Sequence, residues 1–166
     1  MMVNARPLQR LNAHGLSVSL LPGWDIRITL REQSEILVPG DEVPVSGFVH
    51  PVLHAATVAM PPLKGDYGSH VVPLLGLTDV FIAIAEFDAE AGNTPLFRPG
   101  FPKLRASEFD QAALQRALPN RCGTQRFFTV EGRAFSLFCV LGSSVRRNSL
   151  SALATKLLQT VVVEPQ

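Results

Sequence analysis

The alternation of apolar and polar residues near the start of the chain predicts a β-hairpin. Residues 16–20 alternate apolar side chains with serines, and residues 24–31 alternate apolar side chains with charged or polar ones. Pro22 and Gly23 stand between the two runs, where a turn is expected. Trp24 heads the apolar face of the second run, so we expect its ring to anchor the core.

Two further strands are predicted in the middle of the chain. Residues 53–60 are mostly apolar and end at Pro61 and Pro62, which would interrupt a ladder of hydrogen bonds. Residues 80–87 are apolar on both faces until Glu86, as expected of a strand buried in the centre of a sheet.

A second hairpin is predicted late in the chain. Residues 124–130 and 133–141 read as strands, and Glu131 and Gly132 between them suit a two-residue turn in which glycine supplies a positive φ. Cys139 lies in the second of these strands, so we expect it to be a small buried hydrophobic residue.

Two helices are expected beside these strands. Asp110 is a suitable N-cap for a helix over residues 111–118, and Ser149 can cap a last helix. The leucines of the last helix recur at positions i, i+3, i+7 and i+8: Leu150, Leu153, Leu157 and Leu158. These elements predict an α+β fold, an antiparallel sheet built from hairpins with helices packed on one face. The length of 166 residues predicts a single domain over residues 1–166.

Composition narrows the classes of partner. Lys plus Arg is 15 and Asp plus Glu is 14, so the net charge of +1 favours neither nucleic acid nor an anionic membrane. The longest apolar runs are far shorter than the ~18 residues of a membrane-spanning helix. Pro22 and Gly23 follow the first apolar stretch where a signal peptide would be cleaved, so we expect a cytoplasmic protein. A hydrophobic content of 46% with only 17% charged residues favours a surface covered by a protein partner or by a second copy in a homo-oligomer.

Segments at the two ends of the chain resemble a known family. Gly15-Leu16-Ser17-Val18 leads into Pro22-Gly23-Trp24, and Ala134-Phe135-Ser136-Leu137-Phe138 precedes a leucine-rich helix and Val161-Val162-Val163. These segments are similar to the PsbP-like fold family, which includes the photosystem PsbP subunit, Ran-binding Mog proteins and bacterial secretion chaperones. The resemblance implies a protein-binding role more than an enzyme, and it carries over no site residue.

Three histidines and one cysteine are the candidates for chemistry. His50 and His54 are four residues apart, a spacing that places both on one face of a helix or a strand, and His70 follows. They are candidate metal ligands, with structural or surface histidines as the alternative, because no His-Glu-x-x-His motif occurs. Cys122 is a candidate nucleophile, with an unreactive loop thiol as the alternative.

Two long loops, residues 32–51 and 88–102, are candidate binding surfaces because proline and glycine interrupt both of them. The second loop carries aromatic and proline side chains that would form a contact surface or, alternatively, fold back over the core: Phe97, Pro99, Phe101 and Pro102. Arg146 and Arg147 precede the last helix and offer the chemistry of an anion site, with a solvated turn as the alternative.

No motif dictates a reaction, and we expect no cofactor. The first hypothesis is a non-enzymatic protein-binding or assembly module, adaptor or chaperone-like, whose contact surface is formed by the two long loops. The alternative is a small metal-dependent or thiol enzyme that uses His50, His54 and His70 or Cys122.

Overall fold

The computed structural model describes residues 6–31, 50–114, 116 and 118–165. Within these ranges the largest element is a six-stranded sheet of order β3-β4-β5-β8-β7-β6, in which every neighbouring pair is antiparallel except β6 and β7. Its strands are β3 (Asp25–Leu30), β4 (Pro51–Ala56), β5 (Val80–Phe87), β8 (Arg133–Leu141), β7 (Cys122–Val130) and β6 (Arg98–Pro99).

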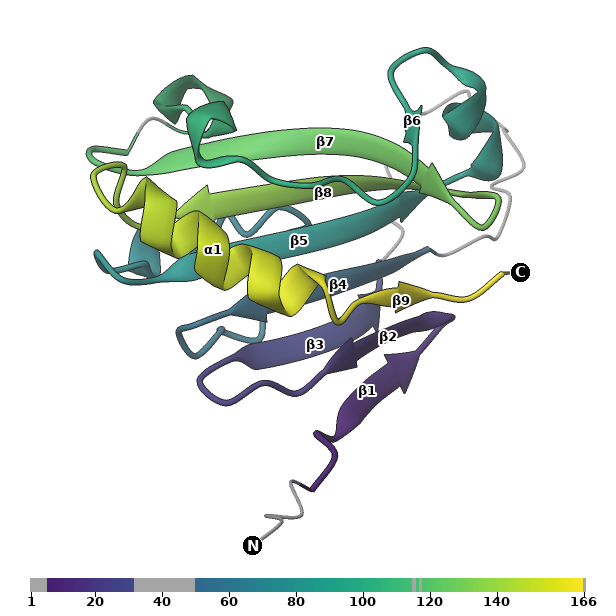
Figure 1. Ribbon diagram of the computed structural model, residues 1–166, viewed down its shortest axis with the longest axis horizontal. Coiled ribbons are helices and arrows are strands. Elements are labelled where there is room, and N and C mark those ends of the chain that lie inside the picture. Colours follow the sequence, from purple (N-terminus) through teal and green to yellow (C-terminus); the bar gives the residue numbers. More distant parts are fainter. Residues whose placement is uncertain (1–5, 32–49, 115, 117, 166) are drawn as a thin grey trace, which may run out of the picture.

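A second, smaller sheet lies beside the first. Its antiparallel strands are β1 (Arg10–Ala13), β2 (Leu16–Ser19) and β9 (Val162–Val163), in the order β1-β2-β9. Figure 1 shows α1 (Arg147–Leu158) running along one face of the large sheet and leading into β9. The remaining described helices are short 3-10 turns: η1 (Val72–Leu74), η2 (Ala89–Asn93), η3 (Ala106–Glu108) and η4 (Gln111–Ala113).

The expected α+β class is wrong, because the described residues form nine strands in two sheets and a single α-helix. The helix predicted over residues 111–118 is reduced to the three-residue η4. Asp110 does cap this turn, since its side chain accepts a hydrogen bond from the amide of Ala112 at 2.9 Å, but Leu114 is already extended. The fold is therefore dominated by its sheets.

The first predicted hairpin is also wrong. Residues 16–19 and 25–30 do form strands, β2 and β3, but these belong to different sheets. β2 pairs instead with β1 across a tight turn at His14 and Gly15, both of which have positive φ (53° and 76°). The Pro22-Gly23 segment thus carries the chain from one sheet to the other.

The second predicted hairpin is confirmed. β7 and β8 pair antiparallel with Val130 opposite Arg133, and Glu131 and Gly132 form the connection with positive φ values of 53° and 72°. β5 over residues 80–87 is confirmed as well, and it pairs with β4 on one side and β8 on the other. The last helix is confirmed, but its N-cap is Arg146 and Ser149 lies inside its first turn.

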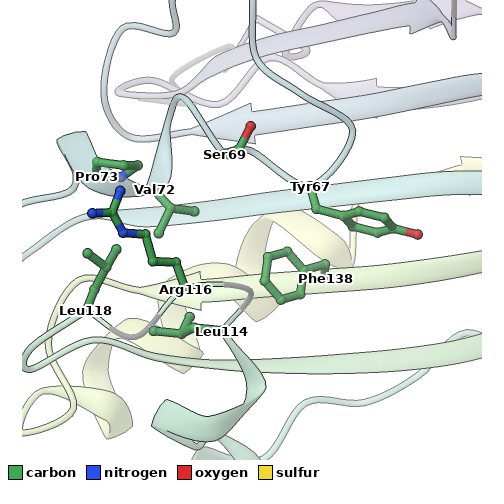
Figure 2. A pocket seen from close by; sticks show the side chains of 8 residues that line it. All are labelled: Tyr67, Ser69, Val72, Pro73, Leu114, Arg116, Leu118 and Phe138. Atoms are coloured by element: carbon green, nitrogen blue, oxygen red, sulfur yellow. The ribbon is translucent and has the colours of Figure 1, made fainter. Parts of the chain in front are cut away.

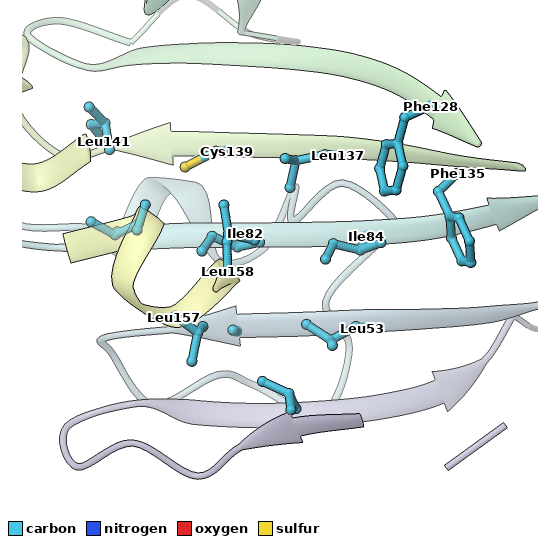
Figure 3. Close-up of a cluster of buried hydrophobic side chains, with 14 of the residues drawn as sticks. Leu53, Ile82, Ile84, Phe128, Phe135, Leu137, Cys139, Leu141, Leu157 and Leu158 are labelled. Carbon is cyan, nitrogen blue, oxygen red and sulfur yellow. The ribbon is translucent and has the colours of Figure 1, made fainter. Parts of the chain in front are cut away.

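The main hydrophobic core lies between the large sheet and α1. Strand residues that face it include Ile82, Leu137 and Cys139, and the helix contributes Leu157 and Leu158 (Figure 3). The small sheet closes the core with Leu16, Val18 and Val163. Trp24 packs against this core while staying partly exposed. In the described part of the chain no helix has the length and apolar character needed to cross a membrane.

A buried arginine forms an ion pair within the large sheet and connects this sheet to the small one. Arg133 of β8 and Glu86 of β5 are 4% and 1% exposed, and the guanidinium donates to both carboxylate oxygens at 2.9 Å. The same guanidinium donates to the backbone oxygens of His14 (3.0 Å), Gly15 (3.1 Å) and Glu164 (3.0 Å). All five donors of this arginine are used, so one side chain ties the large sheet to the β1–β2 turn and to the end of β9.

Candidate functional site: an apolar pocket on the outer sheet face

The face of the large sheet that points away from α1 is covered by loops. Side chains alternate along a strand, so Phe81 and Ala83 of β5, and Phe138 and Val140 of β8, lie on this outer face. They form a second buried cluster with residues of the covering segment, which we define as residues 57–79.

A pocket opens in this cluster between the covering segment and the chain after η4. It has a volume of about 170 Å³, and eight residues line it: Tyr67, Ser69, Val72, Pro73, Leu114, Arg116, Leu118 and Phe138. We call it the Tyr67 pocket. Figure 2 shows these side chains converging from three separate parts of the sequence. Six of the eight are apolar or aromatic, so the pocket suits a hydrophobic group.

Two aromatic rings give the pocket a rigid end. The ring of Tyr67 meets that of Phe138 edge to face, with centroids 5.8 Å apart and an interplanar angle of 88°. This is a favourable aromatic geometry. The Tyr67 hydroxyl lies 3.2 Å from the hydroxyl of Ser136, which also points to the outer face, so the polar end of the ring is satisfied away from the pocket.

The covering segment is anchored to the sheet at several points. Asp79 accepts hydrogen bonds from the Thr57 hydroxyl and the Gly76 amide, both at 2.8 Å, which ties the two ends of the segment together. Gly68 has a φ of 73° and lies so close to Phe81 that a Cβ would overlap its ring. Only glycine meets both conditions, and it seats the backbone between Tyr67 and Ser69 directly on the sheet.

His54 provides a further anchor from β4. Its Nε2 lies 3.0 Å from the backbone oxygen of Asp66, which can only accept, so Nε2 carries the proton. Nδ1 is buried and has no hydrogen-bond partner in the described structure. Burial lowers the pKa of His54 below its ordinary value, against the opposing effect of its hydrogen bond to Asp66, and the charge of Lys64 lowers it further. The neutral ring therefore fixes the backbone at Asp66, next to the pocket residue Tyr67, against β4.

The histidines predicted as metal ligands have separate partners. His54 is held on the outer face as described, whereas His50 Nε2 lies 2.7 Å from Asp88 Oδ1 and its Nδ1 is 4.0 Å from Glu86. His70 is exposed in the covering segment. In the described ranges no group of three or more His, Cys, Asp or Glu side chains is arranged to hold a metal ion.

Cys122 is a buried free thiol at the start of β7. Burial raises its pKa, and the charge of Arg147 only partly opposes this effect. The thiol lies at a polar recess of about 530 Å³ that is also lined by Asp110 and Arg147. A raised pKa disfavours the thiolate, which is the nucleophilic form. Cys139 is fully buried and its pKa is raised still further, as expected of a core residue.

The aromatic residues of the 88–102 loop lie on opposite sides of the sheet edge. Phe101 is packed against the main core, with its centroid 4.9 Å from that of Phe128. Phe97 instead packs against Phe127 (5.3 Å) and Phe87 (6.0 Å), which point to the outer face. For Phe101 this packing favours the alternative in which the loop caps the core.

The other predicted binding residues stay near the surface. Pro99 is exposed in β6, and Pro102 lines a shallow groove beside α1. Arg146 is exposed, whereas the guanidinium of Arg147 donates to the backbone oxygens of Ser144 (3.0 Å) and Phe109 (3.3 Å). The 32–51 loop lies outside the described residues except at His50 and Pro51.

Sequence reasoning missed the Tyr67 pocket. Asp66-Tyr67-Gly68-Ser69 has the composition of an ordinary turn, and Leu114 and Leu118 fell in a segment expected to be helical. The one available signal was Phe138, because a large aromatic residue on the outer face of a strand requires a partner segment to cover it. Comparison of the chain with protein-family models, curated proteins and solved structures finds no match.

Proposed function

We propose that this protein is a non-enzymatic binding module that holds a segment of another protein at the Tyr67 pocket. The observation that carries the proposal is a preformed apolar pocket whose covering segment also exposes two leucines, one of them next in sequence to the pocket residue Pro73. Leu74 is 56% exposed and Leu77 is 58% exposed. Apolar surface around a small pocket is typical of a protein contact, where one anchor side chain fills the pocket and its neighbours cover the surroundings.

The size of the pocket favours a protein segment over a free small molecule. Sites for drug-sized ligands and cofactors occupy about 300–1,000 Å³, whereas a cavity of roughly 150 Å³ holds a group the size of benzene. At about 170 Å³ the Tyr67 pocket matches one aliphatic side chain. A single buried side chain gives little affinity by itself, so the remaining binding energy would come from contacts around the pocket.

Two properties of the sequence support the same proposal. The low content of charged residues, 17%, agrees with a surface that is partly covered by a partner. The resemblance of the chain ends to the PsbP-like family implies protein binding. The enzyme alternative lacks comparable support, since in the described residues the candidate histidines have separate partners and the Cys122 thiol has a raised pKa.

Site-specific photo-crosslinking tests the proposal. A benzoylphenylalanine placed at Ser69, which is exposed at the pocket, should give a discrete crosslinked product in the cells that produce the protein. The same group at Ser149, exposed on α1, is the matched control. The partner identified by mass spectrometry is then purified, and its affinity is measured by calorimetry with the parent and with Ser69→Trp, in which the indole blocks the pocket.

We expect Ser69→Trp to lower the affinity at least tenfold while its thermal melting stays close to that of the parent. The proposal is wrong if Ser69 and Ser149 give the same products, or if the blocked variant binds the purified partner as tightly as the parent does.

A further inference from the structure

The Tyr67 pocket has an excess of positive charge beside its apolar lining. Arg116 lines the pocket and is exposed, and Figure 2 shows its side chain reaching toward Pro73 and Leu118. Arg121 lies next to the same wall, where it donates to the backbone oxygens of Leu75 (2.7 Å) and Pro73 (3.4 Å). Within the described residues neither arginine forms an ion pair.

Neither carboxylate of the covering segment pairs with these arginines in the described structure. Asp79 accepts hydrogen bonds from the Thr57 hydroxyl and the Gly76 amide, and the exposed Asp66 forms no ion pair with Arg116 or Arg121. The Nε of Arg121 is buried without an acceptor in the described structure. The carboxylates of the covering segment therefore do not neutralise the guanidinium groups of Arg116 and Arg121 beside the pocket.

We infer that the partner segment carries a carboxylate next to its aliphatic anchor, so that the anchor fills the Tyr67 pocket while the carboxylate pairs with Arg116. This inference rests on the proposed function and specifies the chemistry of the partner. An aliphatic side chain satisfies the lining, and an adjacent acidic residue complements the charge at the edge of the pocket, which favours this sequence over neutral or basic ones.

The occupant is expected to be a different protein rather than a second copy of this chain. Among the described residues, most large exposed aliphatic side chains that have a charged residue within two positions have a basic one, as at Leu8, Leu63, Leu96 and Val145. These segments would place positive charge against Arg116. Two exceptions have an acidic residue two positions on: Leu77 with Asp79, and Val162 with Glu164. Both carboxylate oxygens of Asp79 already accept hydrogen bonds within this chain, so the Val162 and Glu164 pair defines the self-association outcome of the test.

Peptide titrations followed by ¹⁵N NMR test the inference. The probes are acetylated, amidated pentapeptides that differ only in the residues around one central anchor: Gly-Glu-Leu-Glu-Gly, Gly-Gln-Leu-Gln-Gly and Gly-Lys-Leu-Lys-Gly, with Gly-Glu-Ala-Glu-Gly as the control for the anchor. The amide signals of Ser69, Val72 and Leu118 report on the pocket. The variants are Arg116→Gln and Ser69→Trp, and Arg146→Gln removes an exposed arginine elsewhere as the matched control.

We expect the acidic leucine peptide to bind about two- to fivefold more tightly than the neutral one, the effect of an exposed ion pair, and the basic peptide to bind most weakly. Arg116→Gln should remove the difference between acidic and neutral peptides, whereas Arg146→Gln should preserve it. Ser69→Trp should abolish the pocket shifts with every peptide.

The outcomes separate the two proposals. If the acidic and neutral leucine peptides bind the parent equally, or if Arg116→Gln keeps the preference, the inferred carboxylate is wrong while the binding module stands. If no leucine peptide shifts the pocket signals, the proposed function itself loses its site. Light scattering tests whether the occupant is a second copy of this chain. If the parent self-associates and both Arg116→Gln and Glu164→Gln abolish this association, the occupant is a second copy and the inference is wrong.

Discussion

Replacing Arg133 by methionine should be among the most destabilising substitutions in this chain. The guanidinium is 4% exposed and supplies five donors, two to Glu86 and three to backbone oxygens of the β1–β2 turn and of the chain end after β9. Its removal leaves the buried Glu86 carboxylate without a hydrogen-bonded cation, because His50 Nδ1, at 4.0 Å, is beyond hydrogen-bond distance. Breaking a buried ion pair in this way costs about 3–5 kcal/mol.

The double variant Arg133→Met with Glu86→Leu separates the buried charge from the lost backbone contacts. It removes both charges, so the penalty for an isolated carboxylate disappears. Three backbone oxygens still lose a donor, but that of Gly15 keeps its hydrogen bond from the Glu164 amide. Only the backbone oxygens of His14 and Glu164 then lose a hydrogen bond without another one in its place. At about 0.5–1.5 kcal/mol for each hydrogen bond, the free energy of unfolding of the double variant should fall by only about 1–3 kcal/mol.

Urea denaturation of the parent, the single variant and the double variant measures these values. For a chain of this length a loss of about 3–5 kcal/mol lowers the melting temperature by roughly 6–20 °C, which provides an independent measurement. The double variant should be more stable than the single variant. If it is equally stable or less stable, the buried charge is not the source of the cost and the reasoning fails.

Three further outcomes are expected. Burial lowers the folded-state pKa of His54 below its usual 6.5. The neutral ring therefore contributes its full stability above pH 6.5, and this contribution is lost as the pH falls through the folded-state pKa. The urea midpoints at about pH 7.5 and about pH 5 should differ more in the parent than in His54→Gln. Gly68→Ala should cost about 2–5 kcal/mol because its φ is positive and its Cβ would overlap Phe81, whereas Gly23→Ala, which also has a positive φ but open space, should cost about 1–2 kcal/mol; equal urea midpoints would refute the contact. Phe101→Ser should lower stability by about 2–3 kcal/mol through lost core packing, and an unchanged melting temperature would show that the ring belongs to a contact surface instead.

Local sequence patterns predicted the elements whose partners are close in the chain. The β7–β8 hairpin is specified by two alternating runs and a turn in which Glu131 and Gly132 both adopt positive φ. β5 is equally clear, because only a strand with sheet neighbours on both sides and covered faces can be apolar along nearly its whole length.

The same patterns could not predict which strands share a sheet. The pairing of β2 with β9 joins residues 16–17 to residues 162–163, and no local signal encodes a contact of that sequence separation. The tight turn at His14 and Gly15 connects to a short strand without clear alternation, so the stronger Pro22-Gly23 signal was assigned to the hairpin.

Residues 111–118 do not form the predicted helix, because Leu114 packs against the sheet and lines the pocket. The cap at Asp110 forms, but Leu114 leaves the helical conformation and packs over Gly123 of β7, where a Cβ would lie 3.1 Å from its methyl group. This packing brings Leu114 and Leu118 to the outer sheet face as pocket walls. Tertiary contact thus outweighed a helix propensity that was sufficient only for a single turn.

The two faces of the large sheet have different structural roles, and this separates stability from binding. The inner face is closed by α1, the small sheet and the contacts of Arg133, whereas the outer face at the Tyr67 pocket is closed by the covering segment and the chain after η4. Ser69 and Arg116 are exposed at the edge of the pocket and belong to neither buried cluster. Substitutions at these two positions should therefore change binding with little effect on folding, because exposed side chains outside the core usually change stability by no more than about 0.5 kcal/mol. The Tyr67 pocket can be altered without weakening the core that supports it.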